Sequence, residues 1–220
     1  MKDLIKLLIA LSFISIGFCA CGDDEEETAV DLFADYREVI GYWSNNNWGS
    51  FILQLNPDMT CRVGYGGNNR PKEGTWTYDP DLKQIYTSCE YTFTVKSVTP
   101  YLLVCVDQYG KEYSMKSQDN GSIFECKDWY KLILGNWQDK ASGTILTFTE
   151  DWKLLVNNGT NQYECSYERG NIIPTTYTEN FKVIIRYFTG MRLVFTVVMS
   201  DSNTEELADL LNNEFIFIGR

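Results

Sequence analysis

The sequence contains no histidine among its 220 residues. Histidine is the usual general base near neutral pH and the commonest metal ligand, so Ser-His-Asp and Cys-His catalytic sites and imidazole metal sites are excluded. No glycine-rich loop follows a strand and opens a helix. Paired carboxylates could still cleave a glycosidic bond, but the 30 Asp and Glu residues form no recognisable catalytic motif. The sequence therefore predicts a protein that has no catalytic activity and no metal or other cofactor.

Positive charge is also scarce. The chain carries 19 Lys and Arg against 30 Asp and Glu, a formal net charge of −11. Removal of residues 1–20, with Lys2, Lys6 and Asp3, would change this charge from −11 to −12. Nucleic-acid binding requires clustered Lys and Arg, whereas the one dense charge cluster here, residues 23–27, is acidic. These charges argue against a nucleic-acid partner.

A regular cysteine framework is missing. Five cysteines follow the first 21 residues, an odd number that cannot all pair, and none forms a CxxC motif. Three of them lie in apolar or alternating runs and are expected to behave as small core residues. A single disulfide is compatible with the sequence, but the spacing does not assign it. The five are Cys61, Cys89, Cys105, Cys126 and Cys165.

No apolar run reaches the roughly 20 residues needed to span a membrane as a helix. The longest, residues 7–18, follows a short basic start and precedes Cys19-Ala20-Cys21-Gly22 and the acidic run. This order is typical of a cleaved export signal. An exported protein enters an oxidising compartment, which permits a disulfide.

The residues around Cys21 resemble the lipobox of bacterial lipoproteins. This resemblance implies that residues 1–20 are removed and that the chain is held to the membrane through an N-terminal diacylglyceryl cysteine at Cys21. Cys19 is the rival acylation site, but the bulky Phe18 precedes it. The acidic run resembles the surface-export tag of lipoproteins from Bacteroidetes-type bacteria, which implies the outer face of the outer membrane. A plain signal peptide and a self-repelling spacer are the alternatives.

An internal repeat organises the rest of the chain. Residues 36–43 and 130–137 share Tyr, a basic residue, two aliphatic residues, Gly and Trp in the same order. Residues 53–63 and 146–156 share an apolar segment, a turn with Asp, and a second apolar segment. Two shorter similarities follow, and together they predict two copies of one module. They match Trp76-Thr77-Tyr78 with Cys165-Ser166-Tyr167, and Leu103-Val104 with Leu193-Val194.

Each copy consists of short segments that are rich in aromatic and β-branched residues and separated by turn residues. We therefore predict an all-β chain of two tandem small antiparallel meander β-barrels. The predicted parts are the signal peptide 1–20, an acidic tether and lead-in 21–35, module 1 at 36–117, a linker 118–129 and module 2 at 130–220. The strands predicted in module 1 are 41–45, 50–55, 59–65, 73–78, 83–88, 90–97, 101–107 and 111–116.

Short helices are expected in three places. Residues 28–40 and 123–134 are predicted to be helical or partly so, each leading into one module. Ser202-Asn203-Thr204-Glu205 has the form of a capping box and predicts a helix over 206–211. That helix would be inserted before the last strand, 214–218.

Gly41-Tyr42-Trp43 and Gly135-Asn136-Trp137, each followed by a hairpin, resemble the first strand of small lipocalin-like domains found in lipoproteins of Bacteroidetes. The resemblance implies that Trp43 and Trp137 close one end of each barrel, beneath a basic side chain that follows the last strand. Lys116 and Arg220 hold the corresponding positions. Each copy is shorter than a full lipocalin, and a barrel of about eight strands is either filled by side chains or holds one small ligand.

One loop of module 1 has the composition of a sugar-binding site. Asn46, Asn47 and Trp48 combine amides with a flat aromatic ring, which can stack on a sugar while the amides bind its hydroxyls. Alternatively, Trp48 folds back onto the barrel. In a meander, the loop that begins at Tyr65 lies at the same barrel end. Trp76, Tyr78, Tyr91 and Phe93 are expected in the core.

The sequence thus predicts a surface-anchored outer-membrane lipoprotein that acts as a non-catalytic binding module. Its ligand would be a small apolar molecule, a glycan or another protein. The alternative is an accessory subunit of an outer-membrane assembly, with filled barrels and no small ligand. An open apolar cavity would favour the first prediction, and a filled barrel the second.

Overall fold

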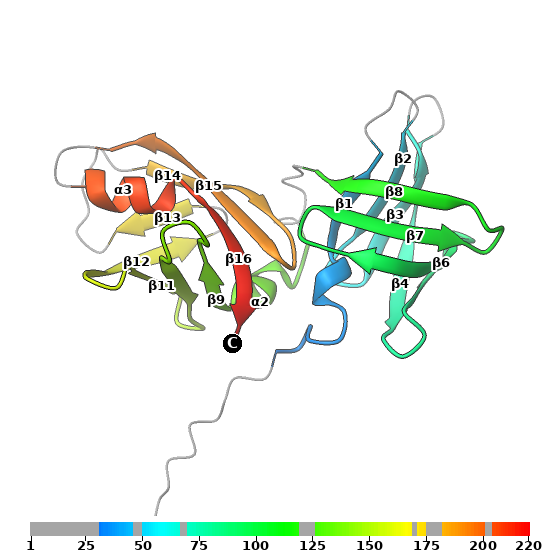
Figure 1. Cartoon of the computed structure of the whole chain (residues 1–220), viewed down its shortest axis with the longest axis horizontal. Helices are drawn as coiled ribbons and strands as arrows, with labels where there is room; N and C mark the ends of the chain where they lie inside the picture. Colours follow the sequence, from blue (N-terminus) through cyan, green and yellow to red (C-terminus); the bar gives the residue numbers. More distant parts are fainter. Residues whose placement is uncertain are drawn as a thin grey trace, which may run out of the picture. The chain divides into compact units, whose positions relative to one another are not determined.

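The computed structural model describes residues 31–45, 50–66, 70–118, 126–168, 171–174, 182–200 and 204–220. Residues 31–220 form one unit, which contains two sheets (Figure 1). Each sheet closes into a barrel of eight antiparallel strands in sequential order. The prediction of two tandem meander barrels is confirmed.

The first barrel contains every strand predicted for module 1, with small shifts at the ends. A three-residue 3-10 helix, η1 (Arg37–Val39), precedes it. Pairing of β8 with β1 closes the barrel. The strands are β1 (Gly41–Ser44), β2 (Phe51–Leu55), β3 (Thr60–Tyr65), β4 (Lys72–Asp79), β5 (Gln84–Thr87), β6 (Thr92–Val98), β7 (Leu102–Asp107) and β8 (Glu112–Ser117).

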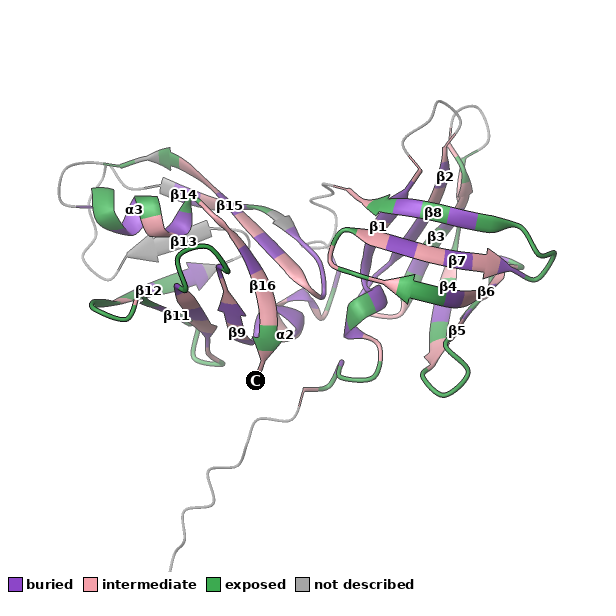
Figure 2. Cartoon of the chain, viewed as in Figure 1, coloured by how far each residue is buried: buried purple, intermediate pink, exposed green. Residues whose placement is uncertain are grey.

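Side chains occupy the interior of this barrel. Burial alternates along the strands, as Figure 2 shows, because successive side chains point to opposite faces. Phe51 lies 4.4 Å from Tyr113 and 5.9 Å from Phe93 between ring centroids. All three rings are buried, together with Leu103 and Met115. A barrel of this size leaves little space once large aromatic residues point inward.

The second barrel has the same order of strands and is closed by pairing of β16 with β9. Two short helices accompany it, α2 (Trp129–Ile133) and α3 (Glu205–Leu211). The strands are β9 (Gly135–Gln138), β10 (Ile145–Phe148), β11 (Lys153–Asn157), β12 (Gln162–Glu168), β13 (Asn171–Pro174), β14 (Lys182–Phe188), β15 (Arg192–Met199) and β16 (Glu214–Gly219).

The helices are present but shorter or differently capped than predicted. Within the described part of 28–40, only η1 is helical, because the backbone turns at residues 32–36 and then extends into β1. Within 123–134, α2 begins at Trp129. Thr204, not Ser202, is the N-cap of α3, so the expected capping box is wrong about where the helix begins. Ser202 itself lies outside the described residues.

The repeat is confirmed at Leu103 and Leu193, but one of its matches is wrong. Val98 pairs with Leu103 and Phe188 with Leu193, and each hairpin carries a β-bulge at the same place. Farther upstream, the structural equivalent of Trp76 is Tyr167 and not Cys165.

The N–H of Trp76 donates to the carbonyl of Met59, and the N–H of Tyr167 donates to that of Trp152. Met59 and Trp152 both have a left-handed φ, 63° and 64°, and so mark the same turn position. Cys165 therefore lies two residues before the equivalent of Trp76. A shift of two residues keeps a side chain on the same face of a strand, so the alternating pattern could not detect the error.

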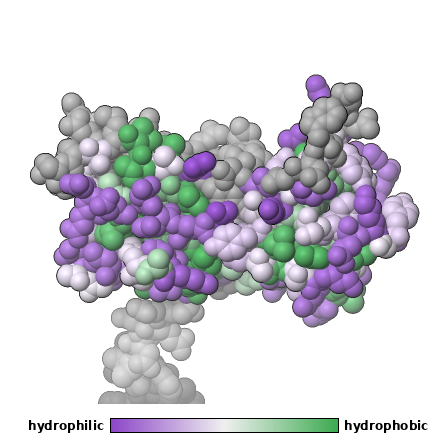
Figure 3. Space-filling model, turned by 45° about the horizontal axis from the view of Figure 1, so that its top comes forward, coloured by the Kyte–Doolittle hydropathy of each residue, from purple (hydrophilic) through white to green (hydrophobic). Residues whose placement is uncertain are grey.

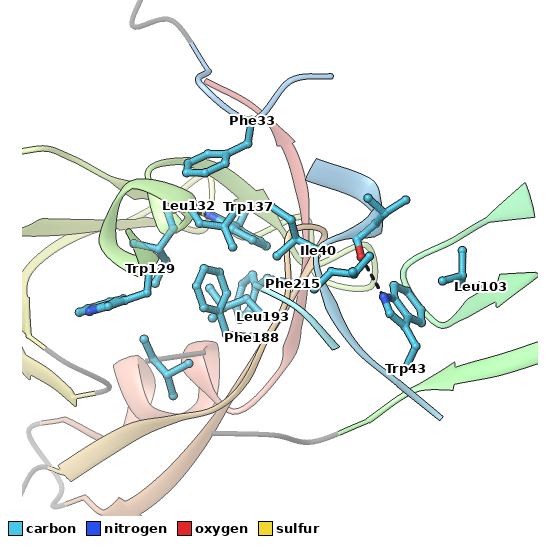
Figure 4. Packing of buried hydrophobic residues seen from close by; sticks show 14 of the residues in the cluster. Phe33, Ile40, Trp43, Leu103, Trp129, Leu132, Trp137, Phe188, Leu193 and Phe215 are labelled. Atoms are coloured by element: carbon cyan, nitrogen blue, oxygen red, sulfur yellow. Dashed lines mark hydrogen bonds between the residues drawn. The ribbon is translucent and has the colours of Figure 1, made fainter. Parts of the chain in front are cut away.

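The two Gly-x-Trp motifs have the same local structure. The indole N–H of Trp43 donates to the Val39 carbonyl at 2.9 Å, and that of Trp137 to the Ile133 carbonyl at 2.8 Å. Figure 4 shows the first of these bonds as a dashed line. Gly135 has a φ of +114°, and a Cβ there would lie 2.8 Å from the Gly219 carbonyl oxygen. Both indoles are buried with their only donor bonded.

Of the two cations implied by the lipocalin resemblance, Lys116 is not where the resemblance placed it. Lys116 pairs with Ser44 across β8 and β1 and is exposed, whereas Trp43 is buried inside the barrel. Arg220 donates to the Lys131 carbonyl. A Cβ at Gly135 would lie 3.0 Å from Arg220 Cγ, so Arg220 lies beside the Gly-x-Trp motif of module 2.

Arg37 precedes β1 but its side chain packs against the second barrel. It is 3% exposed and donates to the carbonyls of Leu132 and Gly190 at 2.7 and 3.2 Å. Its guanidinium lies 3.8 Å from the ring centroid of Phe217, and that ring packs against Trp137 at 5.2 Å. An arginine of η1 thus packs on a ring of β16 that itself contacts Trp137.

Candidate ligand-binding site

An open pocket lies at the end of the first barrel where β3 ends and β4 begins, beside the β5–β6 and β7–β8 turns. We call it the mouth pocket. It has a volume of about 250 Å³. Its lining combines aromatic rings with charged groups from four strand ends. The lining residues are Val63, Gly64, Tyr65, Arg70, Lys72, Glu90, Tyr91 and Tyr109.

Tyr65 is the predicted site residue that the structure places in this pocket. Asn46, Asn47 and Trp48 lie outside the described residues. The ends of their loop are described, and the N–H of Gly66 donates to the Ser50 carbonyl at 2.8 Å. The β1–β2 and β3–β4 loops therefore start side by side, which confirms the prediction that they share one barrel end.

Tyr91, which lines the mouth pocket, packs against two rings of the barrel core. Tyr91 stacks on Phe93 with parallel rings 5.6 Å apart, and Phe51 meets Tyr91 edge-on at 5.4 Å. Phe93 and Trp76 are buried, as predicted. The prediction was incomplete for Tyr91, which is only half-buried and lines the pocket, because it stands at the last turn before β6 begins.

Lys111 links two tyrosines at the rim. Its ammonium group contacts the hydroxyl of Tyr65 and lies 5.0 Å from the ring centroids of Tyr65 and Tyr113. The hydrogen bond from Lys111 lowers the pKa of Tyr65 below its ordinary value, and the same bond raises the pKa of Lys111. Burial raises the pKa of Tyr113, whose hydroxyl donates to Asp107 at 3.1 Å.

The charged residues of the pocket are predominantly basic although the protein is acidic. Lys72 and Glu90 form an exposed ion pair at 2.6 Å, and Arg70 adds a further positive charge. Such groups can hydrogen-bond hydroxyls or an anionic substituent while the tyrosine rings stack on a flat ligand. Across the described ranges, no group of three or more Cys, Asp or Glu residues is arranged to hold a metal ion.

Sequence reasoning missed Arg70, Glu90 and Tyr109. The signal that could have found them is the meander itself, because alternate hairpin turns of an up-and-down barrel lie at one end. The β5–β6 turn carries Glu90 at a φ of 70°, and the β7–β8 turn carries Tyr109, which is 83% exposed. Both turns share the barrel end of the β3–β4 loop that contains Tyr65.

All five described cysteines are free and buried. Burial raises the pKa of Cys61, Cys105 and Cys165 to about 12, so these thiols are protonated and unreactive near neutral pH. The sulfur atoms of Cys61 and Cys89 lie 3.9 Å apart, within hydrogen-bond distance and without a disulfide. This supports the expectation that the cysteines act as small core residues.

The fold and the mouth pocket define a lipocalin-like class of all-β protein, with two tandem barrels and a polar, aromatic pocket at one barrel end. Comparisons with protein-family models, curated proteins and solved structures found no match. In the described part of the chain, no helix has the length and apolar character required to cross a bilayer.

Proposed function

We propose that this protein is a lipid-anchored, non-catalytic binding protein that takes a glycan at the mouth pocket of module 1. The observation that carries the proposal is the convergence of Tyr65, Tyr91 and Tyr109 with charged side chains at one open barrel end. Tyrosine faces suit the C–H face of a sugar ring, and charged groups suit its hydroxyls. No step of bond making or breaking is assigned to the site.

A glycan fits this pocket better than the small apolar molecule that the sequence also allowed. The space inside the first barrel is occupied by buried rings such as Phe51 and Phe93. An apolar ligand in the mouth pocket would cover Arg70, Lys72 and Glu90 without replacing their hydrogen bonds to water, which is costly. A ligand rich in hydroxyl groups replaces those bonds.

The membrane anchor belongs to the same proposal and is supported by the sequence. On this proposal Cys21 is the acylated N-terminus of a lipocalin-like lipoprotein of Bacteroidetes type that faces the cell exterior, and the lipobox-like residues and the acidic run support it. Two acyl chains are enough for stable anchoring, whereas one is marginal. A glycan-binding barrel on the outer face would meet its ligand directly.

The mouth pocket can be tested with a matched pair of tyrosines. Tyr65 lies in the pocket and Tyr86 on the outer wall of the same barrel, and each is 39% exposed. Loss of one stacking ring is expected to weaken glycan binding about two- to tenfold, because an aromatic contact contributes about 0.5–1.5 kcal/mol. We expect this loss in Tyr65→Ala and not in Tyr86→Ala, measured by glycan array and then by calorimetric titration.

Equal affinity of Tyr65→Ala and wild type would contradict the mouth pocket as the glycan site. Absence of glycan binding, together with recovery of the protein in a stable complex from outer-membrane extracts, would favour an accessory subunit instead. The occupied interior of the first barrel suits that second candidate as well. Apolar patches also occur between hydrophilic side chains on the face shown in Figure 3.

A further inference from the structure

A second aromatic site lies on module 2, in the turn between β10 and β11. Trp152 is 44% exposed there and has a φ of 64°. Bulky residues rarely adopt this left-handed conformation. An exposed indole held in a strained turn is an outlier from which a functional hypothesis can be drawn.

Neighbouring rings hold the indole of Trp152 in place. The ring of Tyr130 stacks against it at 5.8 Å with an interplanar angle of 29°. Tyr167 lies 5.3 Å away and Trp129 6.2 Å away. The exposed indole is therefore positioned from three sides before any ligand arrives.

These rings border a second pocket of about 300 Å³, which we call the Trp152 pocket. Its volume is at the lower end of the range of about 300–1,000 Å³ for ligand sites, which suits one ring. Lys131 is oriented by an ion pair with Asp128 at 3.0 Å. The lining residues are Leu32, Tyr130, Lys131, Leu134, Glu150, Trp152, Tyr167 and Arg220.

Module 1 provides an internal comparison. Met59 occupies the equivalent turn with a φ of 63°, and it is half-buried and packed against the core. The fold therefore accepts a flexible methionine at this position and does not require an exposed indole. Stability of the turn therefore does not explain why module 2 has a tryptophan at this position.

We propose that the Trp152 pocket is a second carbohydrate site, which binds a single neutral pyranose ring stacked on Trp152. Glu150 accepts hydrogen bonds from the sugar hydroxyls, and Lys131 donates to others. Lys131 and Arg220 already face the carboxylates of Asp128 and Asp31, at 3.0 and 3.9 Å. The carboxylate of Glu150 therefore disfavours an anionic ligand, and the charged groups together disfavour a wholly apolar one. Apart from Leu32, the lining residues of this pocket belong to module 2, and none of them lines the mouth pocket.

The test uses the full chain labelled with 5-fluorotryptophan, whose six tryptophans give separate fluorine resonances. Short neutral gluco-, xylo- and manno-oligosaccharides are the probes. The resonance of Trp152 is assigned as the one that is absent from the spectrum of Trp152→Met. As at least one probe is titrated in, this resonance is expected to shift until the site is saturated. Trp152→Met should fold normally, because module 1 carries methionine at this turn, and should bind that probe about two- to tenfold more weakly.

Tyr65→Ala separates this proposal from the mouth pocket. We expect the shift of the Trp152 resonance to persist in that variant, with unchanged affinity. The proposal of a second site is overturned if the Trp152 resonance does not move with any probe, if Trp152→Met keeps wild-type affinity, or if Tyr65→Ala abolishes the Trp152 shift. The glycan function of the mouth pocket could still hold in each case.

Discussion

Arg37 and Asp31 form the most buried ion pair among the described residues. The guanidinium Nε donates to Asp31 Oδ2 at 2.7 Å, and Nη2 donates to Oδ1 at 2.9 Å. Burial alone would raise the pKa of Asp31, but hydrogen bonds from Arg37 and from the Phe33 N–H outweigh it and lower this pKa below 3.8. The pair fixes the arginine that packs on Phe217.

Asp31→Asn is therefore expected to reduce the free energy of unfolding at pH 7 by about 3 kcal/mol, because it leaves a buried charge without its partner. A carboxylate whose folded pKa is lowered stabilises the fold above its unfolded pKa, and this contribution is lost as pH falls through the folded pKa. The difference between variant and wild type should thus shrink below about pH 4. The free energies of unfolding of Asp31→Asn and wild type are measured by urea unfolding, followed by circular dichroism, at pH 7 and at a pH below about 4.

A suitable control is the exposed pair of Arg62 and Glu73, whose atoms are 3.6 Å apart. Glu73→Gln should change the free energy of unfolding by less than about 1 kcal/mol. Equal effects of Asp31→Asn and Glu73→Gln would show that the buried pair contributes no more than a surface pair.

The β14–β15 turn shows how one element is adapted to a distant contact. Thr189 Oγ1 accepts hydrogen bonds from the two N–H groups that follow Gly190, and Thr99 does the same in the equivalent turn of module 1. Module 1 has Pro100 at the position of Gly190. Glycine is therefore not needed by the turn itself. A Cβ at Gly190 would lie 1.8 Å from the carbonyl oxygen of Arg37, so the contact with η1 requires the glycine.

Gly190→Ala is expected to lower the free energy of unfolding by about 1–3 kcal/mol, since backbone atoms must move to admit the methyl group. The matched control is Pro100→Ala in the turn of module 1, with an expected change of less than about 1 kcal/mol. Thermal unfolding of both variants measures the effect. A wild-type midpoint for Gly190→Ala would contradict the contact between Gly190 and Arg37.

The secondary-structure elements were the part of the structure that the sequence predicted best. The eight strands of module 1 follow from alternating side chains, and turns such as residues 56–58 follow from Pro, Asn and Asp. Helix lengths and the match of Trp76 with Cys165 were wrong. Both errors concern positions that a local sequence pattern does not determine. The end of a helix depends on where the chain must enter a sheet. A pattern of period two looks the same after a shift of two residues.

For the molecule as a whole, the proposed anchor gives a prediction that does not depend on the barrels. Cys21→Ala should abolish metabolic labelling with a fatty acid and release the protein from the membrane fraction, because the thiol is the acceptor of the lipid. Cys19→Ala is the control and should leave labelling intact. Persistent labelling of Cys21→Ala would identify Cys19 as the acylated residue.

Two copies of one module have acquired different surfaces on the same scaffold. Met59 and Trp152 share a backbone conformation, yet only the second is an exposed ring in a pocket. Pro100 and Gly190 share a turn, yet only the second lies against Arg37. Duplication lets each copy serve as a structural control for the other.

Local sequence patterns were sufficient to predict the all-β class, the duplication and the position of Tyr65 near a barrel mouth. Side-chain alternation and turn chemistry are encoded by near neighbours in the chain. The mouth pocket, the Trp152 pocket and the bonding of Arg37 required the folded chain. Arg37 and Gly190 are 153 residues apart in sequence, and no local pattern relates them. Their contact, like each pocket lining, exists only after the strands have packed.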